Sequence, residues 1–265
     1  MSYHGIIRGM TSKLWVPALV CATMASAQPA NQAGIAHVAF RVADLEAARA
    51  FYNKLGFEQF FEMKQGDRTT EAFLKINDHQ FIELYPQTAP TQAIGLMHVC
   101  YESNDLEALH AEHVKRGLTV SDVRKAGAGN MLMTMKDPEG QTIEYTQYMP
   151  GSRHYEDRGK HLGADRIAQT LVGATAPAQD AAAIRKFYVE KLGFTEAGGH
   201  LRMPGDSGQG LAIVAGDKSG IQFAVGDLKR AATALSALGL TVKSSPTAVT
   251  VSDPDGVAIT FVKGN

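Results

Sequence analysis

A unit of one strand, one helix and further strands recurs along the chain, and this repeat restricts the folds open to it. The stretch GIAHVAFRVADLEAARAFYNKLG at residues 34–56 joins an apolar strand to a short amphipathic helix. Asp44 is suited to begin that helix and Gly56 to end it. Altered copies of the unit follow, one up to residue 148 and two more after residue 166. The sequence therefore predicts four βαβββ modules in two pairs, an α+β fold.

Each module is expected to contribute four strands and one helix. In the first module we expect a strand at 35–42, a helix at 44–55 and strands at 57–63, 72–76 and 80–85. In the second we expect a strand at 94–101, a helix at 105–116 and strands at 119–123, 131–135 and 142–148. Tight turns, DPEG at 137–140 and DPDG at 253–256, mark equivalent positions of the two halves.

The first 27 residues are expected to form a signal peptide outside the fold. Arg8 and Lys13 precede an apolar stretch at 14–24, and the sequence ASA at 25–27 has the form of a cleavage site. The protein is therefore expected to be exported, either to the periplasm or out of the cell. No apolar run approaches the roughly 20 residues that a membrane helix needs, so no membrane span is expected.

Composition limits the partners that the protein is expected to have. The 265 residues carry a formal net charge of −1, and 45% are hydrophobic, as in ordinary soluble globular proteins. A charge this close to neutral gives no reason to expect nucleic acid as a partner. Four modules in one chain remove the need for a dimer, but they are compatible with a homodimer.

The repeat divides the mature chain into two domains. The first domain is expected at residues 34–150 and the second at residues 167–265. Between them, residues 151–166 are charged and contain glycine without a clear period, which favours a linker that crosses the surface.

Two histidines and two glutamates keep one spacing in the first two modules. His37 and His98 are 61 residues apart, and so are Glu83 and Glu144. If the modules pack as pseudo-symmetric copies, these four side chains meet near one approximate two-fold axis. Two imidazoles and two carboxylates form a ligand set for a divalent metal such as Zn, Ni, Fe, Mn or Co, and the set contains no soft thiolate.

Each of these residues also has an ordinary structural interpretation. A single histidine in an apolar strand is more often a hydrogen-bonded core residue, and a single glutamate usually faces solvent. Only the four together favour a metal site. His110 and His113 lie one turn apart on the expected helix at 105–116, where a solvated helix face is the preferred interpretation.

The sequence resembles the vicinal oxygen chelate superfamily of glyoxalase I, methylmalonyl-CoA epimerase, fosfomycin and bleomycin resistance proteins and extradiol dioxygenases. The matching stretches are GIAHVAFRVADLEAARAFYNKLGF, FIELYP, GLMHVCYESNDLEAL and DPEGQTIEY. The resemblance implies that each βαβββ pair forms an eight-stranded, cupped mixed sheet around a metal. It also implies that the metal ligands are His37, Glu83, His98 and Glu144.

The second half departs from this pattern. At three positions where the resemblance would place ligands, the chain has Gly173 (or Gln169, with a longer loop), Gly220 and Thr260. The strand GLAIV at 210–214 contains no glutamate either. We therefore expect residues 167–265 to form a degenerate domain without metal ligands, either a structural partner or a wall over the first cup.

Four ligands of this kind resemble glyoxalase I and the epimerases, which implies proton transfer on a small oxygenated substrate, as a lyase or an isomerase. In those enzymes the metal binds two neighbouring substrate oxygens, and a ligand glutamate acts as the base. Glu144 or Glu83 would then be catalytic, and Arg41 would bind a substrate carboxylate. Glyoxalase I itself is disfavoured, because its substrate needs cytosolic glutathione and this chain is expected to be exported.

Two other functions remain open. A non-haem Fe(II) extradiol-type dioxygenase would use His37, His98 and Glu144 as ligands and keep Glu83 off the metal. Residues 129–136 lack the histidine and tyrosine of the dioxygenase pattern, and the substitutes that the chain offers are Tyr145, Tyr148 and His154. The second alternative is a ligand-sequestering protein like the bleomycin resistance proteins, which tend to lack metal ligands.

Overall fold

The computed structural model describes residues 1–2, 32–205 and 207–264, so the expected signal peptide lies outside the described residues apart from its first two. In the first half the elements are β1 (Gln32–Val42), α1 (Leu45–Lys54), β2 (Gln59–Gln65), β3 (Arg68–Lys75), β4 (Phe81–Pro86), β5 (Gly95–Ser103), α2 (Leu106–Lys115), β6 (Arg124–Lys125), β7 (Met131–Lys136) and β8 (Thr142–Gln147). In the rest of the chain they are α3 (Arg153–Glu156), β9 (Thr170–Ala178), α4 (Ala181–Leu192), β10 (Thr195–Ala197), β11 (His200–Arg202), β12 (Gly210–Ala215), β13 (Gly220–Val225), α5 (Leu228–Ala237), β14 (Lys243–Ser244), β15 (Ala248–Ser252) and β16 (Ala258–Lys263). None of these described helices is long and apolar enough to cross a membrane.

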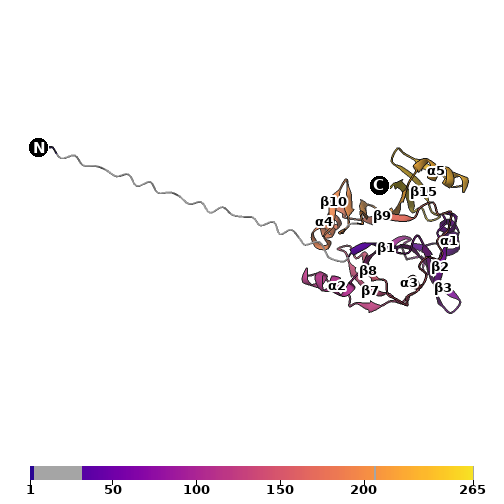
Figure 1. The fold of residues 1–265 in the computed structure, drawn as a ribbon, viewed down its shortest axis with the longest axis horizontal. Helices are drawn as coiled ribbons and strands as arrows, with labels where there is room; N and C mark the ends of the chain where they lie inside the picture. Colours follow the sequence, from indigo (N-terminus) through magenta and orange to yellow (C-terminus); the bar gives the residue numbers. More distant parts are fainter. Residues whose placement is uncertain (3–31, 206, 265) are drawn as a thin grey trace.

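The strands form two mixed sheets of eight strands each. The first has the order β2-β3-β4-β1-β5-β8-β7-β6, and the second has the equivalent order β10-β11-β12-β9-β13-β16-β15-β14. At the centre of each sheet the first strands of two modules pair antiparallel, β1 with β5 and β9 with β13. Figure 1 shows the two halves one above the other, with β1 and β9 facing each other. The predicted α+β fold of four βαβββ modules in two paired sheets is confirmed.

The same local signals begin and end the four long helices. Asp44 caps α1 by accepting from the backbone N–H groups of Glu46 and Ala47 at 2.9 and 3.0 Å. The N-cap residues of α2, α4 and α5 are Asp105, Asp180 and Asp227. Glycines with positive φ follow the helices, namely Gly56 at 85°, Gly117 at 74°, Gly193 at 78° and Gly239 at 77°. Because Asp begins and Gly ends each of these helices, the helices predicted from the sequence agree with those of the structure.

Two segments differ from the sequence expectation. The strand expected at 119–123 contributes only an isolated bridge between Val120 and Met135. The segment 151–166, expected to cross the surface as a linker, is mostly exposed but contains α3 and buries His154. The fully buried Lys75 holds this segment through an ion pair with the Asp157 carboxylate at 2.9 Å. A buried cation needs such a partner, which ties the segment to the first sheet.

One of the two histidines of α2 lies in the core. His113 is fully buried, and its ring lies 5.0 Å from that of Tyr145 between centroids. The expectation of a solvated histidine pair is therefore wrong for His113. The physical reason is the helical period, because His113 continues the buried stripe of Leu106 and Leu109. Burial lowers the pKa of His113 to about 4, so the ring is neutral.

The two halves exchange equivalent contacts through their Asp-Pro turns. The carboxylate of Asp255 accepts from the backbone N–H of Ala43, just before α1, with both oxygens at 3.3 Å. In the reciprocal contact, Glu139 accepts from the backbone N–H groups of Gln179 and Asp180 at 2.9 and 2.6 Å, just before α4. The repeated turn thus binds the start of a helix in the opposite half.

A buried glutamine joins β1 to β9 across the same interface. The Gln80 amide donates to the carbonyls of Ile35 and Leu171 at 3.1 and 2.8 Å, and its Oε1 accepts from the Leu171 N–H at 2.8 Å. Nearby, the rings of Phe57 and Phe223 stack with centroids 5.0 Å apart. One side chain therefore satisfies the backbone polar groups of both halves inside an apolar interface.

Replacing Gln80 by leucine should lower the free energy of unfolding by about 2 to 4 kcal/mol, because the Leu171 backbone groups lose partners in a buried place. Urea unfolding followed by circular dichroism would measure the change. The matched variant Gln179→Leu, on an exposed side chain, should change the free energy by less than about 0.5 kcal/mol. Equal effects of the two variants would contradict the role given to Gln80.

Replacing His113 by leucine should flatten the dependence of stability on pH. The pKa of His113 is about 4 in the folded chain and about 6.5 in the unfolded chain, so the unfolded chain binds more protons between these values. The wild type therefore loses stability as the pH falls from about 6.5 to about 4, and His113→Leu should lose less. Urea unfolding at both ends of this range measures the difference. The variant His110→Leu, on the same helix outside the core, should keep the wild-type dependence.

Candidate metal centre

The centre of the first sheet places three side chains close together. His37 lies on β1, which pairs with β4 on one edge and with β5 on the other. The neighbouring residue on the same face, Ala39, lies opposite Glu83 of β4 and opposite His98 of β5. Because Ala39 is only a methyl group, it leaves room for the two larger side chains on either side of it.

The fourth predicted ligand comes from the strand beyond β5. Glu144 of β8 lies opposite Cys100 of β5, and Cys100 lies opposite His37 of β1. The four residues singled out in the sequence therefore stand on the four central strands and on one face of the sheet. The equal spacing of 61 residues reflects this pseudo-symmetric placement of the two modules.

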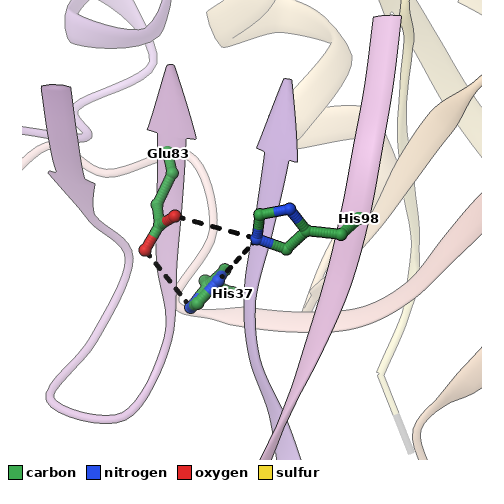
Figure 2. Close-up of side chains that lie close together, drawn as sticks. All are labelled: His37, Glu83 and His98. Carbon is green, nitrogen blue, oxygen red and sulfur yellow. Dashed lines mark hydrogen bonds and ion pairs between the residues drawn. The ribbon is translucent and has the colours of Figure 1, made fainter. Parts of the chain in front are cut away.

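The potential donor atoms form two groups that share His37, one of His37, Glu83 and His98 and one of His37, Cys100 and Glu144, each within 4.8 Å. The Nε2 atom of His37 lies 3.1 Å from Nε2 of His98 and 3.3 Å from Glu144. The Nε2 atom of His98 lies 3.9 Å from Glu83 and 3.8 Å from Glu144. On its other side, His37 meets Glu83 through Nδ1 at 3.3 Å. Figure 2 shows His37, Glu83 and His98 pointing toward one another from three neighbouring strands.

This arrangement fits a divalent metal. An ion bound to nitrogen and oxygen at about 2.0 to 2.2 Å keeps neighbouring donors about 3 to 3.5 Å apart, and His37 Nε2 has His98 and Glu144 within this range, while Glu83 lies 3.9 Å from His98. The donors are withdrawn from water, with exposed fractions of 5% for His37, 4% for Glu83 and 8% for His98. Imidazole and carboxylate donors suit Zn, Ni, Fe, Mn and Co. The chain thus provides the donor set of a divalent metal site.

Burial and neighbouring charges shift the pKa values of the side chains at this centre. Burial, together with the charges of Glu71 and Glu144, raises the pKa of Glu83 well above its usual value. Burial lowers the pKa of His98 to about 4, so its ring is neutral and Nε2 can offer a lone pair. Burial would also raise the pKa of Glu144, but the hydrogen bond and charge of His37 outweigh it and lower that pKa. Two carboxylates placed around the same two imidazoles favour a bound cation.

A cavity of about 380 Å³ opens over His37, Glu83 and Glu144. Its lining comes from the first sheet, from residues 124–132 and from α3, and consists of His37, Met63, Glu71, Phe73, Glu83, Tyr85, Arg124, Ala126, Gly127, Ala128, Asn130, Leu132, Glu144, Thr146, Tyr148 and His154. All of these residues precede residue 167, so none of the described residues of the second half forms a wall over the first cup. That alternative is wrong, because the interface between the halves lies elsewhere, around Gln80 and the stacked rings.

Two residues extend the carboxylate side of the centre. The Tyr85 hydroxyl lies 2.5 Å from Glu71 and 3.1 Å from Glu83, and so bridges the two carboxyl groups. The alternation within 80–85 places Tyr85 on the face of Glu83, so the sequence contained a signal for it. It contained none for Glu71, because β3 begins at Arg68 and the expected strand began at 72.

His154 enters the cavity from a segment outside the repeat. The Oδ1 atom of Asn130 accepts from the Met149 N–H at 3.3 Å, so its amide nitrogen faces His154 Nδ1 at 2.9 Å. The ring proton therefore lies on Nε2, which has no hydrogen-bond partner among the described residues. Burial lowers the pKa of His154 to about 3, so the ring is a neutral donor. No periodic pattern in 151–166 could have indicated this.

Two further sequence expectations change at this site. Arg41 does not line the cavity; its guanidinium donates to the carbonyl of Ala93 at 3.2 Å, and the arginine in the lining is Arg124. The reason is distance along β1, because Arg41 pairs with Gly95 at the far end of the strand. A thiol also joins the centre, since Cys100 lies with His37 and Glu144 in one group of potential ligand atoms within 4.8 Å. Burial raises the pKa of Cys100 well above its usual value and keeps it a neutral thiol.

The equivalent positions of the second sheet carry no such donors. Strand pairing identifies the counterparts of His37, Glu83, His98 and Glu144 as Gly173, Ala212, Gly220 and Thr260. The register settles the choice between Gly173 and Gln169, because Gln222 lies opposite Gly173 as Cys100 lies opposite His37.

Comparison with known proteins agrees with this architecture. The family model of the Glyoxalase/Bleomycin resistance protein/Dioxygenase superfamily matches residues 34–145. No curated protein matches the sequence.

Solved structures with this fold cover both halves of the chain. The manganese-bound glyoxalase from Novosphingobium aromaticivorans has 16% identity and a TM-score of 0.68, over 88% of this chain and 82% of that one. The 2,3-dioxygenase LapB from Pseudomonas sp. KL28 has 17% identity and a TM-score of 0.66, over 89% and 93%. Homoprotocatechuate 2,3-dioxygenase from Brevibacterium fuscum has 18% identity and a TM-score of 0.64, over 91% and 83%. Residues 34–145 thus match the Glyoxalase/Bleomycin resistance protein/Dioxygenase superfamily, and both halves of the chain have the fold of these solved structures.

Proposed function

We propose that the protein is a metal-dependent enzyme that moves a proton on a small substrate carrying two neighbouring oxygens, as a lyase or an isomerase of the glyoxalase type. The observation that carries this proposal is the placement of Glu83, His98 and Glu144 around His37, with His37, Glu83 and Glu144 lining a cavity of about 380 Å³. The manganese-bound state of the Novosphingobium glyoxalase makes manganese the first metal to test.

In this function a divalent metal, when bound, would polarise the two substrate oxygens and make the neighbouring C–H bond more acidic. The protein's own groups would then hold and move the proton. Glu83 is placed to accept it, because one of its oxygens faces His37 while the other accepts from Tyr85. The Tyr85 hydroxyl continues to Glu71, and this chain of hydrogen bonds holds the Glu83 carboxyl in one orientation.

The apolar part of the lining would exclude water from the reacting carbon. Met63, Phe73 and Leu132 supply apolar surface around the cavity, and Arg124 adds a positive charge that suits an anionic substrate group. The substrate carboxylate assigned to Arg41 from the sequence is therefore proposed for Arg124 instead.

A second candidate is an extradiol-type dioxygenase, and two observations favour it. The shortest contact of Glu83 with His37 is to Nδ1, the nitrogen that faces away from His98, so Glu83 would orient the His37 ring while His37, His98 and Glu144 bind Fe(II). His154 and Tyr148 also line the cavity and would stand in for the histidine and tyrosine that 129–136 lacks. Tyr145, the third candidate from the sequence, is fully buried in the core.

Metal content tests the centre itself. Protein purified without chelator or affinity metal should contain about one divalent ion per chain by mass spectrometry, and His98→Ala should contain less than about a tenth of that, because one of few ligands is lost. The far-ultraviolet circular dichroism should stay unchanged. His110→Ala, outside the centre, should keep its metal. A stoichiometric ion in His98→Ala would refute the assignment, and a metal-free wild type would make the ligand-sequestering protein the leading interpretation.

Glu83→Gln separates the two enzyme classes. In the proton-transfer enzyme the amide replaces a charged ligand and the base, so metal affinity should fall about tenfold or more together with activity on hydroxy- and keto-acids. In the dioxygenase the variant should retain Fe(II) under anaerobic conditions and still consume O₂ with a catechol. Glu107→Gln, on the exposed face of α2, is the matched control and should behave as the wild type in both assays.

A further inference from the structure

The second sheet also has a cavity over its cupped face, although it lacks the metal donors. The cavity has a volume of about 500 Å³, and its lining includes Gly173 and Ala212, the counterparts of His37 and Glu83. With glycine and alanine at these two positions, this cup contains a hollow rather than a filled core. We propose that this second cup binds a small carboxylate-bearing ligand, with Arg202 as its anchor.

Arg202 occupies the position that Lys75 has in the first half. Lys75 of β3 lies opposite Phe81, and Arg202 of β11 lies opposite Gly210. Phe81 and Gly210 are themselves equivalent, because Phe81 pairs with His37 and Gly210 pairs with Gly173. The pseudo-symmetry of the two sheets thus places a cation at the same point of each cup.

In the first half that cation binds carboxylates of the chain itself. Lys75 Nζ lies 2.9 Å from the carboxylate of Asp157 and 2.8 Å from that of Asp78. In the second half Arg202 is exposed, lines the cavity and makes no ion pair with any carboxylate among the described residues. Within residues 32–205 and 207–264, the same place in the fold therefore has carboxylate partners in the first cup and none in the second.

The surroundings of Arg202 suit an anion. His200 lies two residues before it on β11, so the two side chains share a face, and both line the cavity. Gln222 of β13 adds an amide over Gly173. Among the described lining residues, none is acidic, whereas the first cup contains Glu71, Glu83 and Glu144. A planar guanidinium in such a hollow favours bidentate binding of a carboxylate.

The size of the ligand follows from the cavity. A volume of about 500 Å³ lies within the range of small-molecule sites and is too small for a folded partner. The floor of glycine and alanine accepts a flat or compact body, while the cation fixes its charged end.

Residue-resolved nuclear magnetic resonance on the zinc-loaded full chain tests this proposal and separates it from the metal centre. Benzoate is the probe and benzamide the uncharged control. Benzoate should shift the amide signals of Gly173 and Gln222 and saturate at about 1 mM or below, and Arg202→Gln should weaken binding about tenfold or more. Lys229→Gln, which removes an exposed cation of α5, should leave the binding unchanged.

Three outcomes would overturn the proposal. One is the absence of a saturable shift in the second cup, and another is equal binding of benzamide. The third concerns Asp206, which follows Arg202 by four residues and lies outside the described residues. Benzoate binding seen only in Asp206→Asn would mean that the chain fills the site itself. Shifts confined to Gly127 would report the first cup alone and would count against a second site, while the metal content of the first cup stays an independent measurement.

Discussion

The double pairing of β1 is the constraint on which the first half depends. This strand pairs in parallel with β4 of its own module and antiparallel with β5 of the next, so it joins two modules into one sheet. The same pairing puts His37 between the strands that carry Glu83 and His98. The small side chain of Ala39 leaves the space in which their donors approach one another. Both the first sheet and the metal centre therefore depend on the pairing of β1.

Equal spacing in a repeat made the metal donors predictable. When two modules pack as pseudo-symmetric copies, residues at equivalent positions of the repeat lie close together in space. The helices were predictable for a local reason, since Asp44 and Gly56 act on neighbouring backbone groups. Glu71 and His154 were not predictable, because the tertiary fold brings each of them to the cavity and no strand or helix periodicity in the sequence indicates this. His113 was misjudged because a solvated face was assumed for α2, whereas the stripe of Leu106 and Leu109 continues through it.

The two halves share a scaffold but differ in what the scaffold carries. Reciprocal contacts from Asp255 and Glu139, and the bonds of Gln80, keep the interface equivalent on both sides. The cups have diverged, because the donor positions of the second contain glycine, alanine and threonine. The residues that hold the two halves together are thus different from the residues that line the cavities. Because the interface contacts do not involve the cavity residues, a sheet without metal donors can have the same fold as one with them.

The place of β1 in the chain also affects how the protein can reach its fold. β1 ends at Val42, whereas its partners β4 and β5 begin only at Phe81 and Gly95, so its pairings are non-local and slow to form. Until they form, the apolar strand has two open edges and the character of an aggregation-prone segment. Arg41, which stays out of the cavity, interrupts that strand with a charge near its end. A charge at this position is typical of the gatekeeper residues that limit aggregation of apolar strands in natural sequences.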